Sequence, residues 1–449
     1  MNATPRIAFY TLGCKVNQNE TEAFAGLFRG KGYQIVSFTE KADVYLINTC
    51  TVTHLADRKS RQIIRRALKS NPQAKIVVTG CYAQTNAAAI QKIAGVHLII
   101  GTNEKGRLVE LVESLFELTG EEEDLGALKQ TPQIFVREYE PGEEFVEIKS
   151  EKSIERARAY LKIQEGCDQY CSFCIIPFAR GPIRSRSVES TLAEAARLIE
   201  AGYKEIVLLG IHLGAYGREQ GKDLNLALLL KQLLPLDKQV RWRLGSLEPI
   251  EVSPELLEIM QEDPNLCPHL HLPLQSGHND ILKAMRRPYT TERYLQIITE
   301  IRAKIPGIAL TTDVMVGFPG ETDVHFQEYL SFVEKVAFSR LHVFKYSPRQ
   351  GTPAASFGGQ VTPTVKEARS RKMIRLGQKL AREYAQGFLE QSLDVLVEEK
   401  VADNLWEGSS ANYLKVRFQA TEAPRGQIIS VRLKKIEQDY CLGEVENHE

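Results

Sequence analysis

Apolar runs of strand length alternate with amphipathic, helix-like stretches through the first part of the chain. The runs are RIAFYTLGC, ADVYLINTC, AKIVVTGC and VHLIIGT, and the first three are separated by NQNETEAFAGLFRGKG and DRKSRQIIRRALKSNPQ. Strands that alternate with helices form a parallel sheet through right-handed crossovers. The pattern therefore predicts a parallel-sheet α/β domain at residues 4–117.

A second alternation follows an acidic segment, residues 118–152, whose weak periodicity predicts a linker. At residues 153–383 six apolar runs alternate with helical patterns. The runs are AYLKIQ, EIVLLG, RWRLGS, HLHLPL, ALTTDVMVG and RLHVFKYS. A complete (β/α)8 barrel typically needs about 250 residues. Six units in this shorter span predict a partial (β/α)6 barrel.

The tail, residues 384–449, is strand-like, with DVLVEEK, YLKVRF and GQIISVRL separated by polar turns, and predicts a small β barrel. The chain is 43% apolar and 25% charged, as is usual for a globular protein. The N-terminal residues lack a basic region followed by a long apolar run, and no stretch approaches the length of a membrane span. We therefore expect a cytoplasmic protein with no membrane contact, whose thiols stay reduced.

Three of the eight cysteines, Cys14, Cys50 and Cys81, each close one of the first three apolar runs. In a parallel sheet they would lie along the carboxyl edge, where open α/β sheets place their ligands. The alternative is three small buried residues, since free cysteine is often buried. Because the pattern repeats at three strand ends, it favours a ligand-binding site formed by the three thiols.

The segment CDQYCSFC holds Cys167, Cys171 and Cys174 directly after the first predicted barrel strand, with no fourth cysteine or histidine close by. Structural zinc takes four protein ligands, and iron–sulfur cubanes usually take four cysteines. A 4Fe–4S cluster on three thiolates would leave one iron open to a substrate or cofactor. Zinc remains the alternative.

The two trios together carry a family resemblance. TLGCKVNQNETEA, INTCTVT, ADRKSRQIIRRA and VVTGCYAQ are similar to the N-terminal domain of the methylthiotransferases of the radical S-adenosylmethionine (SAM) superfamily. IQEGCDQYCSFCIIPFARGPIRSRS, RLGSLEP, HLHLPLQSG and GFPGET resemble their catalytic barrel, and the tail resembles their RNA-binding TRAM domain. The resemblance covers nearly the whole chain. GCKVNQ, NTCTVT and GCYAQ resemble the branch that acts on N6-threonylcarbamoyladenosine at position 37 of tRNA.

The resemblance implies an enzyme that methylthiolates C2 of this base with two SAM molecules, one as methyl donor and one as source of a 5′-deoxyadenosyl radical. Cys167, Cys171 and Cys174 would hold the radical-forming 4Fe–4S cluster, and Cys14, Cys50 and Cys81 an auxiliary 4Fe–4S cluster that supplies sulfur. Reduced flavodoxin or ferredoxin would supply electrons. The residues implied in SAM binding, each of which could instead serve a turn or a helix cap, are Phe173, Gly210, Gly214, Ser246, Glu248, Gln275 and Gly317.

Basic residues gather in the stretch from Arg58 to Lys69, whereas residues 391–449 hold seven Lys or Arg against eleven Asp or Glu. We expect Arg65 and Arg66 to contact tRNA phosphates, and Arg180 and Arg184 to face the anionic threonylcarbamoyl group. Three alternatives stay open. The chain could act on another modified tRNA adenosine or on a ribosomal-protein side chain, it could be a non-catalytic metal-cluster RNA-binding protein, or its tail could bind protein.

Overall fold

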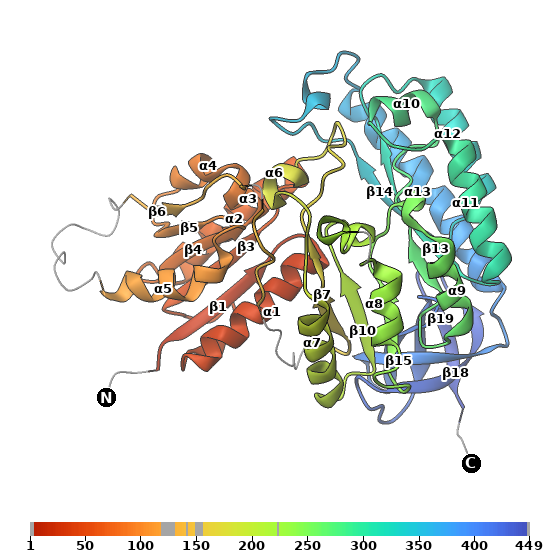
Figure 1. The fold of residues 1–449 in the computed structure, drawn as a ribbon, viewed down its shortest axis with the longest axis horizontal. Coiled ribbons are helices and arrows are strands. Elements are labelled where there is room, and N and C mark those ends of the chain that lie inside the picture. The colour runs from red at the N-terminus through yellow and green to blue at the C-terminus, as the bar shows by residue number, and fades with distance from the viewer. Residues whose placement is uncertain (1–3, 118–130, 141, 149–155, 222–223, 447–449) are drawn as a thin grey trace. The chain divides into compact units, whose positions relative to one another are not determined.

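The computed structural model describes residues 4–117, 131–140, 142–148, 156–221 and 224–446 (Figure 1). They form two compact units. The N-terminal unit comprises residues 1–151, 164–186 and 347–355, and the barrel unit comprises residues 152–163, 187–346 and 356–449. Among the described residues, no helix combines the length and the apolarity that crossing a membrane requires.

The N-terminal unit is built on a parallel six-stranded sheet in the order β2-β1-β3-β4-β5-β6. Its strands are β1 (Arg6–Thr11), β2 (Gln34–Val36), β3 (Val44–Thr49), β4 (Lys75–Gly80), β5 (Leu98–Ile100) and β6 (Gln133–Phe135). Its helices include α1 (Lys15–Gly30), α2 (His54–Ser70), α3 (Cys81–Thr85), α4 (Ala87–Gln91) and α5 (Leu108–Glu117). This confirms the predicted parallel-sheet α/β architecture.

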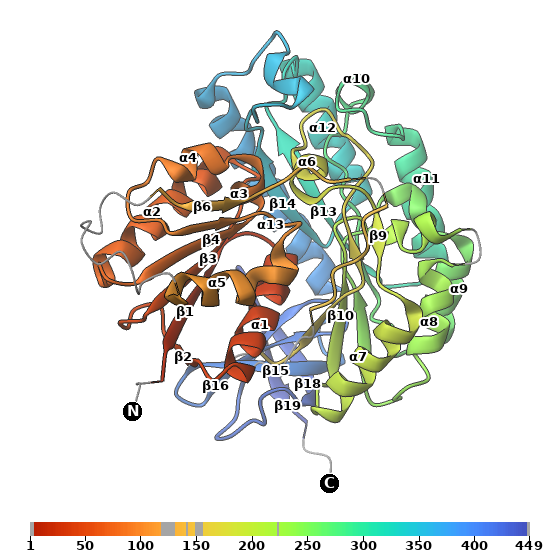
Figure 2. The ribbon, with the colours of Figure 1, turned by 60° about the vertical axis from the view of Figure 1, so that its left-hand side comes forward.

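Helices cover both faces of this sheet, as Figure 2 shows. Alternate residues of β3 divide between two cores. Val44 and Leu46 pack with α1 and α5, and Tyr45 and Ile47 pack with α2, α3 and α4. Strands buried on both faces are continuously apolar, which is why the pattern of the sequence revealed them.

Two short strands of this sheet were not predicted. β2 has three residues, and β6 lies inside the acidic segment that was predicted as a linker. Pairing of Leu98 with Gln133 adds β6 to the edge of the sheet beside β5. The remainder of that segment lies partly outside the described residues.

The barrel unit holds six parallel strands, which confirms the predicted partial barrel. They are β7 (Ala159–Lys162), β10 (Glu205–Leu209), β11 (Arg241–Leu244), β12 (His269–His271), β13 (Ala309–Val316) and β14 (Arg340–Lys345). Isolated bridges such as that of Ser246 with His271 join β11 to β12. The surrounding helices are α7 (Val188–Glu200), α8 (Leu226–Leu233), α9 (Pro254–Glu262), α10 (Asn279–Ala284), α11 (Thr291–Lys304) and α12 (Asp323–Val336). β7 and β14 are its edge strands.

The chain then continues through α13 (Pro363–Gln386) into a closed barrel, here called the C-terminal barrel. Its strands are β15 (Ser392–Ala402), β16 (Leu405–Ser410), β17 (Lys415–Gln419), β18 (Ile428–Ile436) and β19 (Cys441–Val445). Arg241 at the start of β11 donates to the backbone oxygens of Asp394 and Ser409 at 2.9 and 2.8 Å. Arg243 donates to the backbone oxygen of Ala411 at 2.9 Å. These bonds seat the C-terminal barrel on the amino ends of the strands.

Candidate functional site

The first three cysteines follow three adjacent strands. Residue pairs such as Thr11–Asn48 and Thr49–Gly80 align the carboxyl ends of β1, β3 and β4. Cys14 precedes α1, Cys50 follows β3, and Cys81 begins α3. Burial is the main reason that the pKa of Cys81 is raised, and the neighbouring Cys50 and Cys14 add to it, as expected for three thiols at one site. The structure thus brings the predicted trio together at one sheet edge.

A glycine keeps the chain close to this trio. Gly13 has φ +105°, and a Cβ atom built on it would lie 2.9 Å from Cβ and 3.0 Å from Sγ of Cys50. No side chain larger than hydrogen fits between the two segments. The glycine therefore lets the segment that carries Cys14 pack directly against the Cys50 side chain.

Arg180 is fully buried beside Cys81 and donates from Nε to Sγ of Cys81 at 3.2 Å. Its other nitrogens bind Glu20 at 2.7 Å and Glu165 at 3.1 Å. Lys105, also buried, pairs with the same two carboxylates at 2.9 and 2.5 Å. Two cations therefore balance two carboxylates in a dry environment, where charges are stable only when paired.

Burial raises the pKa of the Cys81 thiol to about 12, although the Arg180 guanidinium acts to lower it. Burial also raises the pKa of Cys50. Both thiols are therefore protonated in the metal-free protein, and metal binding must displace their protons. A set of three soft sulfur ligands without a fourth fits an iron–sulfur cluster that has one open iron.

The second trio lies in the same compact unit, in the segment between β8 (Gln164–Glu165) and β9 (Arg184–Ser185). The Cys167 amide donates to the Gly181 oxygen at 3.0 Å, and the Cys174 amide donates to the Cys171 oxygen at 3.0 Å. Gly166, just before Cys167, has φ +78° and approaches the Pro182 oxygen so closely that a Cβ atom would lie 1.7 Å from it. The backbone therefore forms a tight, well-bonded loop that carries three thiols.

The loop that follows Cys50 is held by a buried ion pair. Arg349 contacts Asp57 at 2.7 Å and Thr51 at 2.6 Å, and Thr51 donates to Asp57 at 2.8 Å. Asp57 directly precedes the basic stretch from Arg58 to Lys69, and its buried ion pair with Arg349 compensates its charge. The exposed cations of α2, none of which has a side-chain partner among the described residues, are Arg58, Lys59, Arg65, Arg66 and Lys69.

Six of the seven residues implied in SAM binding lie in the barrel unit, after the carboxyl ends of four neighbouring strands. Gly210 and Gly214 follow β10, Ser246 and Glu248 follow β11, Gln275 follows β12, and Gly317 follows β13. Glu248 pairs with Arg287, and the Gly317 amide donates to Glu321 at 2.8 Å. Phe173, the seventh, is half-buried in the N-terminal unit. Their role in SAM binding stays a prediction.

The expected role of Arg180 and Arg184 is wrong. Arg180 has no exposed surface and is saturated by its partners. Arg184 is buried, lies 4.6 Å from the ring centroid of Tyr139, and donates to the Arg180 backbone oxygen at 2.7 Å. Neither guanidinium is open to a substrate carboxylate. Both arginines support the cysteine segments instead.

Sequence reasoning missed the buried partners of the first trio. Glu20, Lys105 and Glu165 come from three distant segments, and the first two are ordinary helical charges in the sequence. Arg349 was missed for the same reason, since its partner lies 292 residues away. The local signal is Glu165, a carboxylate that stands between the apolar run AYLKIQ and the pair Gly166 and Cys167.

Two family profiles match the chain. A profile described as uncharacterized protein family UPF0004 matches residues 6–101, which span the first cysteine trio. A profile described as the radical SAM superfamily matches residues 161–333, which span the second trio and most of the partial barrel.

Curated relatives match over nearly the full chain. A protein of Bacillus subtilis named threonylcarbamoyladenosine tRNA methylthiotransferase MtaB is 43% identical over 98% of this chain and 96% of its own length. A Thermotoga maritima protein of the same name is 35% identical, over 96% and 95%. A Moorella thermoacetica protein named tRNA-2-methylthio-N(6)-dimethylallyladenosine synthase is 32% identical, over 97% of each chain.

Among solved structures, the radical SAM methyltransferase TsrM from Kitasatospora setae, determined with cobalamin and a [4Fe-4S] cluster bound, superposes with a TM-score of 0.57. The match covers 78% of this chain and 77% of that one at 14% identity. A likeness at this identity supports the fold alone.

Proposed function

Because the chain belongs to the family of radical SAM tRNA methylthiotransferases, we propose that it methylthiolates C2 of N6-threonylcarbamoyladenosine at position 37 of tRNA. The observation that carries the proposal is the cysteine at each of three adjacent strand ends, in one compact unit with a second three-cysteine loop. The choice of threonylcarbamoyladenosine as the substrate base rests on sequence identity. The relatives named for this base are up to 43% identical to the chain, whereas the Moorella relative named for dimethylallyladenosine is 32% identical.

In the proposed reaction the adenine C2–H bond breaks and a C2–S bond forms, and one SAM transfers its methyl group to that sulfur. The hydrogen leaves in 5′-deoxyadenosine, which would form with methionine when a second SAM is cleaved with one electron that derives from reduced flavodoxin or ferredoxin. The sulfur is at the sulfide level, so its bond to the C2 radical releases one electron, which the cluster that provided the sulfur would accept. Bound 4Fe–4S clusters would supply the low-potential electron at Cys167, Cys171 and Cys174, and the sulfur at Cys14, Cys50 and Cys81.

The residues of the chain have supporting roles in this proposal. Arg180 holds Cys81 through its N–H···S bond, and its ion pairs with Glu20 and Glu165 fix the position of the guanidinium group. Arg349 fixes the loop after Cys50. The exposed cations of α2 follow that loop, so phosphates bound to them would lie near the first trio. Ser246, Gln275 and Gly317 stand at strand ends where a nucleoside cofactor would bind.

The test compares three tRNAs of identical sequence that carry threonylcarbamoyladenosine, dimethylallyladenosine or unmodified adenosine at position 37. We expect a methylthio product, measured by nucleoside mass spectrometry, with the first tRNA only. Equal reaction of the unmodified tRNA would contradict the choice of base. No reaction with any tRNA would favour a ribosomal-protein substrate, and metal binding without SAM cleavage would favour a non-catalytic RNA-binding protein.

The metal content provides a separate test. Anaerobically reconstituted protein should hold about eight iron atoms if each trio binds a 4Fe–4S cluster. Replacing Cys167, Cys171 and Cys174 with alanine should leave about half of that iron. Stoichiometric zinc without iron would contradict the proposal.

A further inference from the structure

Four side chains of the metal-ligating kind meet in the barrel unit, where the N-terminal ends of α10 and α12 lie beside each other (Figures 1 and 2). His278 is the N-cap residue of α10, Asp280 lies in the first turn of α10, and His325 lies in the first turn of α12. One ligand atom from each of these three residues lies within 4.8 Å of the other two. The carboxylate of Glu328, further along α12, lies 3.3 Å from Nε2 of His278. The reaction proposed above gives these residues no role.

The spacing of these side chains suits a single ion. The rings of His278 and His325 lie with their centroids 4.1 Å apart and their planes at 30°. Ligands at about 2.0 Å from a tetrahedral zinc ion are about 3.3 Å from one another, so the ligand atoms have to approach by about 1.5 Å at most. Asp280 and Glu328 can make this movement, because both are exposed and His278 is the one side chain that either carboxylate contacts among the described residues.

The hydrogen bonds of the two rings show that both imidazoles are neutral. Nδ1 of His278 accepts from the Asp280 amide at 3.2 Å, and Nδ1 of His325 accepts from the Thr322 amide at 3.3 Å. An imidazolium ring has no acceptor atom, and the neutral ring is the form that binds metal. Binding through Nε2 moves the ring proton to Nδ1 and gives up these two bonds. Both bonds are long and exposed, so water can replace them at the start of each helix.

The charge and the type of the ligand atoms indicate the class of metal. Two neutral imidazoles and two carboxylates carry two negative charges, which balance the charge of a divalent cation. Imidazole nitrogen suits zinc, copper, nickel and iron, whereas magnesium and calcium are usually held by oxygen atoms alone. Zinc accepts both His nitrogen and carboxylate oxygen in four-coordinate sites. The ligand set also differs from the two cysteine trios, because it contains no sulfur.

We propose that His278, Asp280, His325 and Glu328 bind one zinc ion that cross-links α10 to α12. The segments that lead into these helices follow the neighbouring parallel strands β12 and β13. Gln275 lies in the first segment and Gly317 in the second, so the ion would tie together two loops at the carboxyl ends of the strands. The inference is independent of the proposed function, because it uses no cysteine and no step of the reaction.

The test uses anaerobically reconstituted protein and the variant H278N/H325Q. Asparagine is a favoured N-cap residue, and glutamine at the third helical position completes a capping box, so both helices keep their starts and the iron content should not change. Zinc affinity is measured by competition with a chromophoric chelator. Wild type should bind one zinc ion beyond its iron, and the variant should bind it at least about a hundredfold more weakly, since loss of an outer-shell partner alone costs about 10–100-fold.

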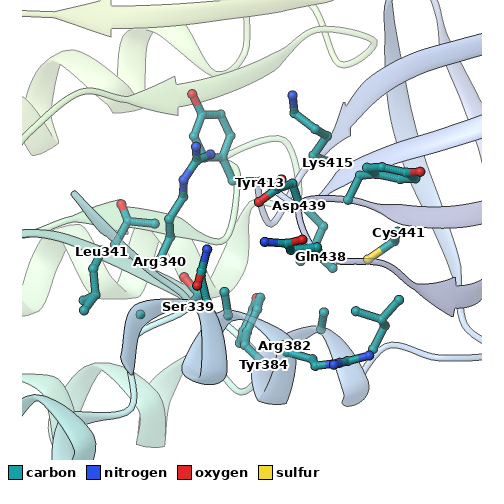
Figure 3. Close-up of a pocket in the computed structure, with 18 of the residues that line it drawn as sticks. Ser339, Arg340, Leu341, Arg382, Tyr384, Tyr413, Lys415, Gln438, Asp439 and Cys441 are labelled. Atoms are coloured by element: carbon teal, nitrogen blue, oxygen red, sulfur yellow. The ribbon is translucent and has the colours of Figure 1, made fainter. Parts of the chain in front are cut away.

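Two single substitutions serve as matched controls. H54N removes an exposed imidazole from α2. D439N removes an exposed carboxylate that lines the cavity between β14, α13 and the C-terminal barrel (Figure 3). Both variants should bind zinc as wild type does, whereas D280N should bind it more weakly. Equal zinc affinity of wild type and H278N/H325Q would overturn the inference.

X-ray absorption at the zinc edge identifies the ligands in the iron-loaded protein. We expect a shell of nitrogen and oxygen at about 2.0–2.2 Å, and a sulfur shell at about 2.3 Å would place the zinc at cysteines and refute the site. Hydrogen exchange measures the cross-link itself. Zinc should slow amide exchange in residues 276–282 and 320–328 of wild type and leave H278N/H325Q unchanged. Exchange in wild type that does not respond to zinc would contradict the proposed cross-link.

Discussion

Nε of Arg180 donates a hydrogen bond to Sγ of Cys81 across 3.2 Å, and both side chains are buried. The arginine belongs to the segment that carries the second cysteine trio, and the acceptor belongs to the first trio. Hydrogen bonds to the sulfur ligands of an iron–sulfur cluster are among the factors that set its reduction potential. Arg180 therefore gives the second cysteine segment a direct influence on the chemistry of the first trio.

We predict that R180Q shifts the reduction potential of the auxiliary cluster to a more negative value, since a positive charge and an N–H···S bond are both lost. The background should lack Cys167, Cys171 and Cys174, so that one cluster titrates in a potentiometric experiment followed by electron paramagnetic resonance. R180K keeps the charge and should give an intermediate potential. The control R184K leaves the bond to Cys81 intact and should titrate as the parent protein does. Identical potentials for R180Q and the parent protein would refute this role.

Substitution of Gly166 should abolish the second cluster selectively. In G166A the new methyl group would meet the Pro182 oxygen at 1.7 Å and force the residue out of φ +78°, so the loop that carries Cys167 cannot keep its shape. We expect reconstituted protein to retain about half of its iron and to lose SAM cleavage. Gly202 offers a matched control, because it has φ +87° but open space around it. G202A should cost about 1 kcal/mol of stability and keep all the iron.

Charge reversal on α2 should weaken tRNA binding without changing base selectivity. Arg65 and Arg66 are exposed and have no side-chain partner among the described residues. Because phosphate contacts position RNA without specifying sequence, R65E/R66E should lower affinity equally for all substrate tRNAs and reduce the salt dependence of binding. Fluorescence anisotropy at several salt concentrations measures both. The control K41E/K92E reverses two exposed charges elsewhere in the same unit, and an equal loss of affinity in that variant would remove the special role of α2.

Glu205 should be essential to stability. It is fully buried and contacts Arg158, Arg241 and Arg243 at 3.0, 2.6 and 3.0 Å. Burial alone would raise the pKa of its carboxyl, but the three guanidinium groups outweigh burial and hold that pKa well below its usual range. E205Q leaves buried arginines uncompensated, so we expect a loss of about 3–5 kcal/mol in the free energy of unfolding, measured in urea at pH 7.

The pH dependence of this effect has a defined sign. A carboxyl whose folded pKa is depressed stabilises the protein above its unfolded pKa of about 4.3, and this contribution is lost as pH falls toward the folded pKa. The difference between wild type and E205Q should therefore be constant above about pH 5 and shrink in more acid solution. The exposed pair of Glu255 with Lys231 is the control, and E255Q should cost at most about 1 kcal/mol. If the difference in unfolding free energy between wild type and E205Q grew on acidification, the stabilising role of the Glu205 carboxylate would be contradicted.

The strands that could be predicted from the sequence are those that are buried along nearly their whole length. β3 and β4 are buried on both faces, so their apolar runs are continuous, and the cysteines at their ends could be assigned to one sheet edge. β6 could not be predicted, because three residues at a sheet edge carry too little periodicity inside an acidic segment. The role of Arg180 was misassigned for a related reason. Its charge is visible in the sequence, but the carboxylates that bury it are separated from it by up to 160 residues.

The bond between Arg180 and Cys81 spans 99 residues of chain, and a ribosome adds about 5–20 residues per second. Cys81, the last of the first three cysteines, therefore leaves the ribosome roughly 5–20 s before the arginine that completes its surroundings. During that interval Glu20 can pair with Lys105, once Lys105 has left the ribosome, but it cannot yet pair with Arg180. We expect stable iron loading of the first trio to wait until synthesis has passed the second cysteine segment, so that translation itself sets the order in which the metal centres mature.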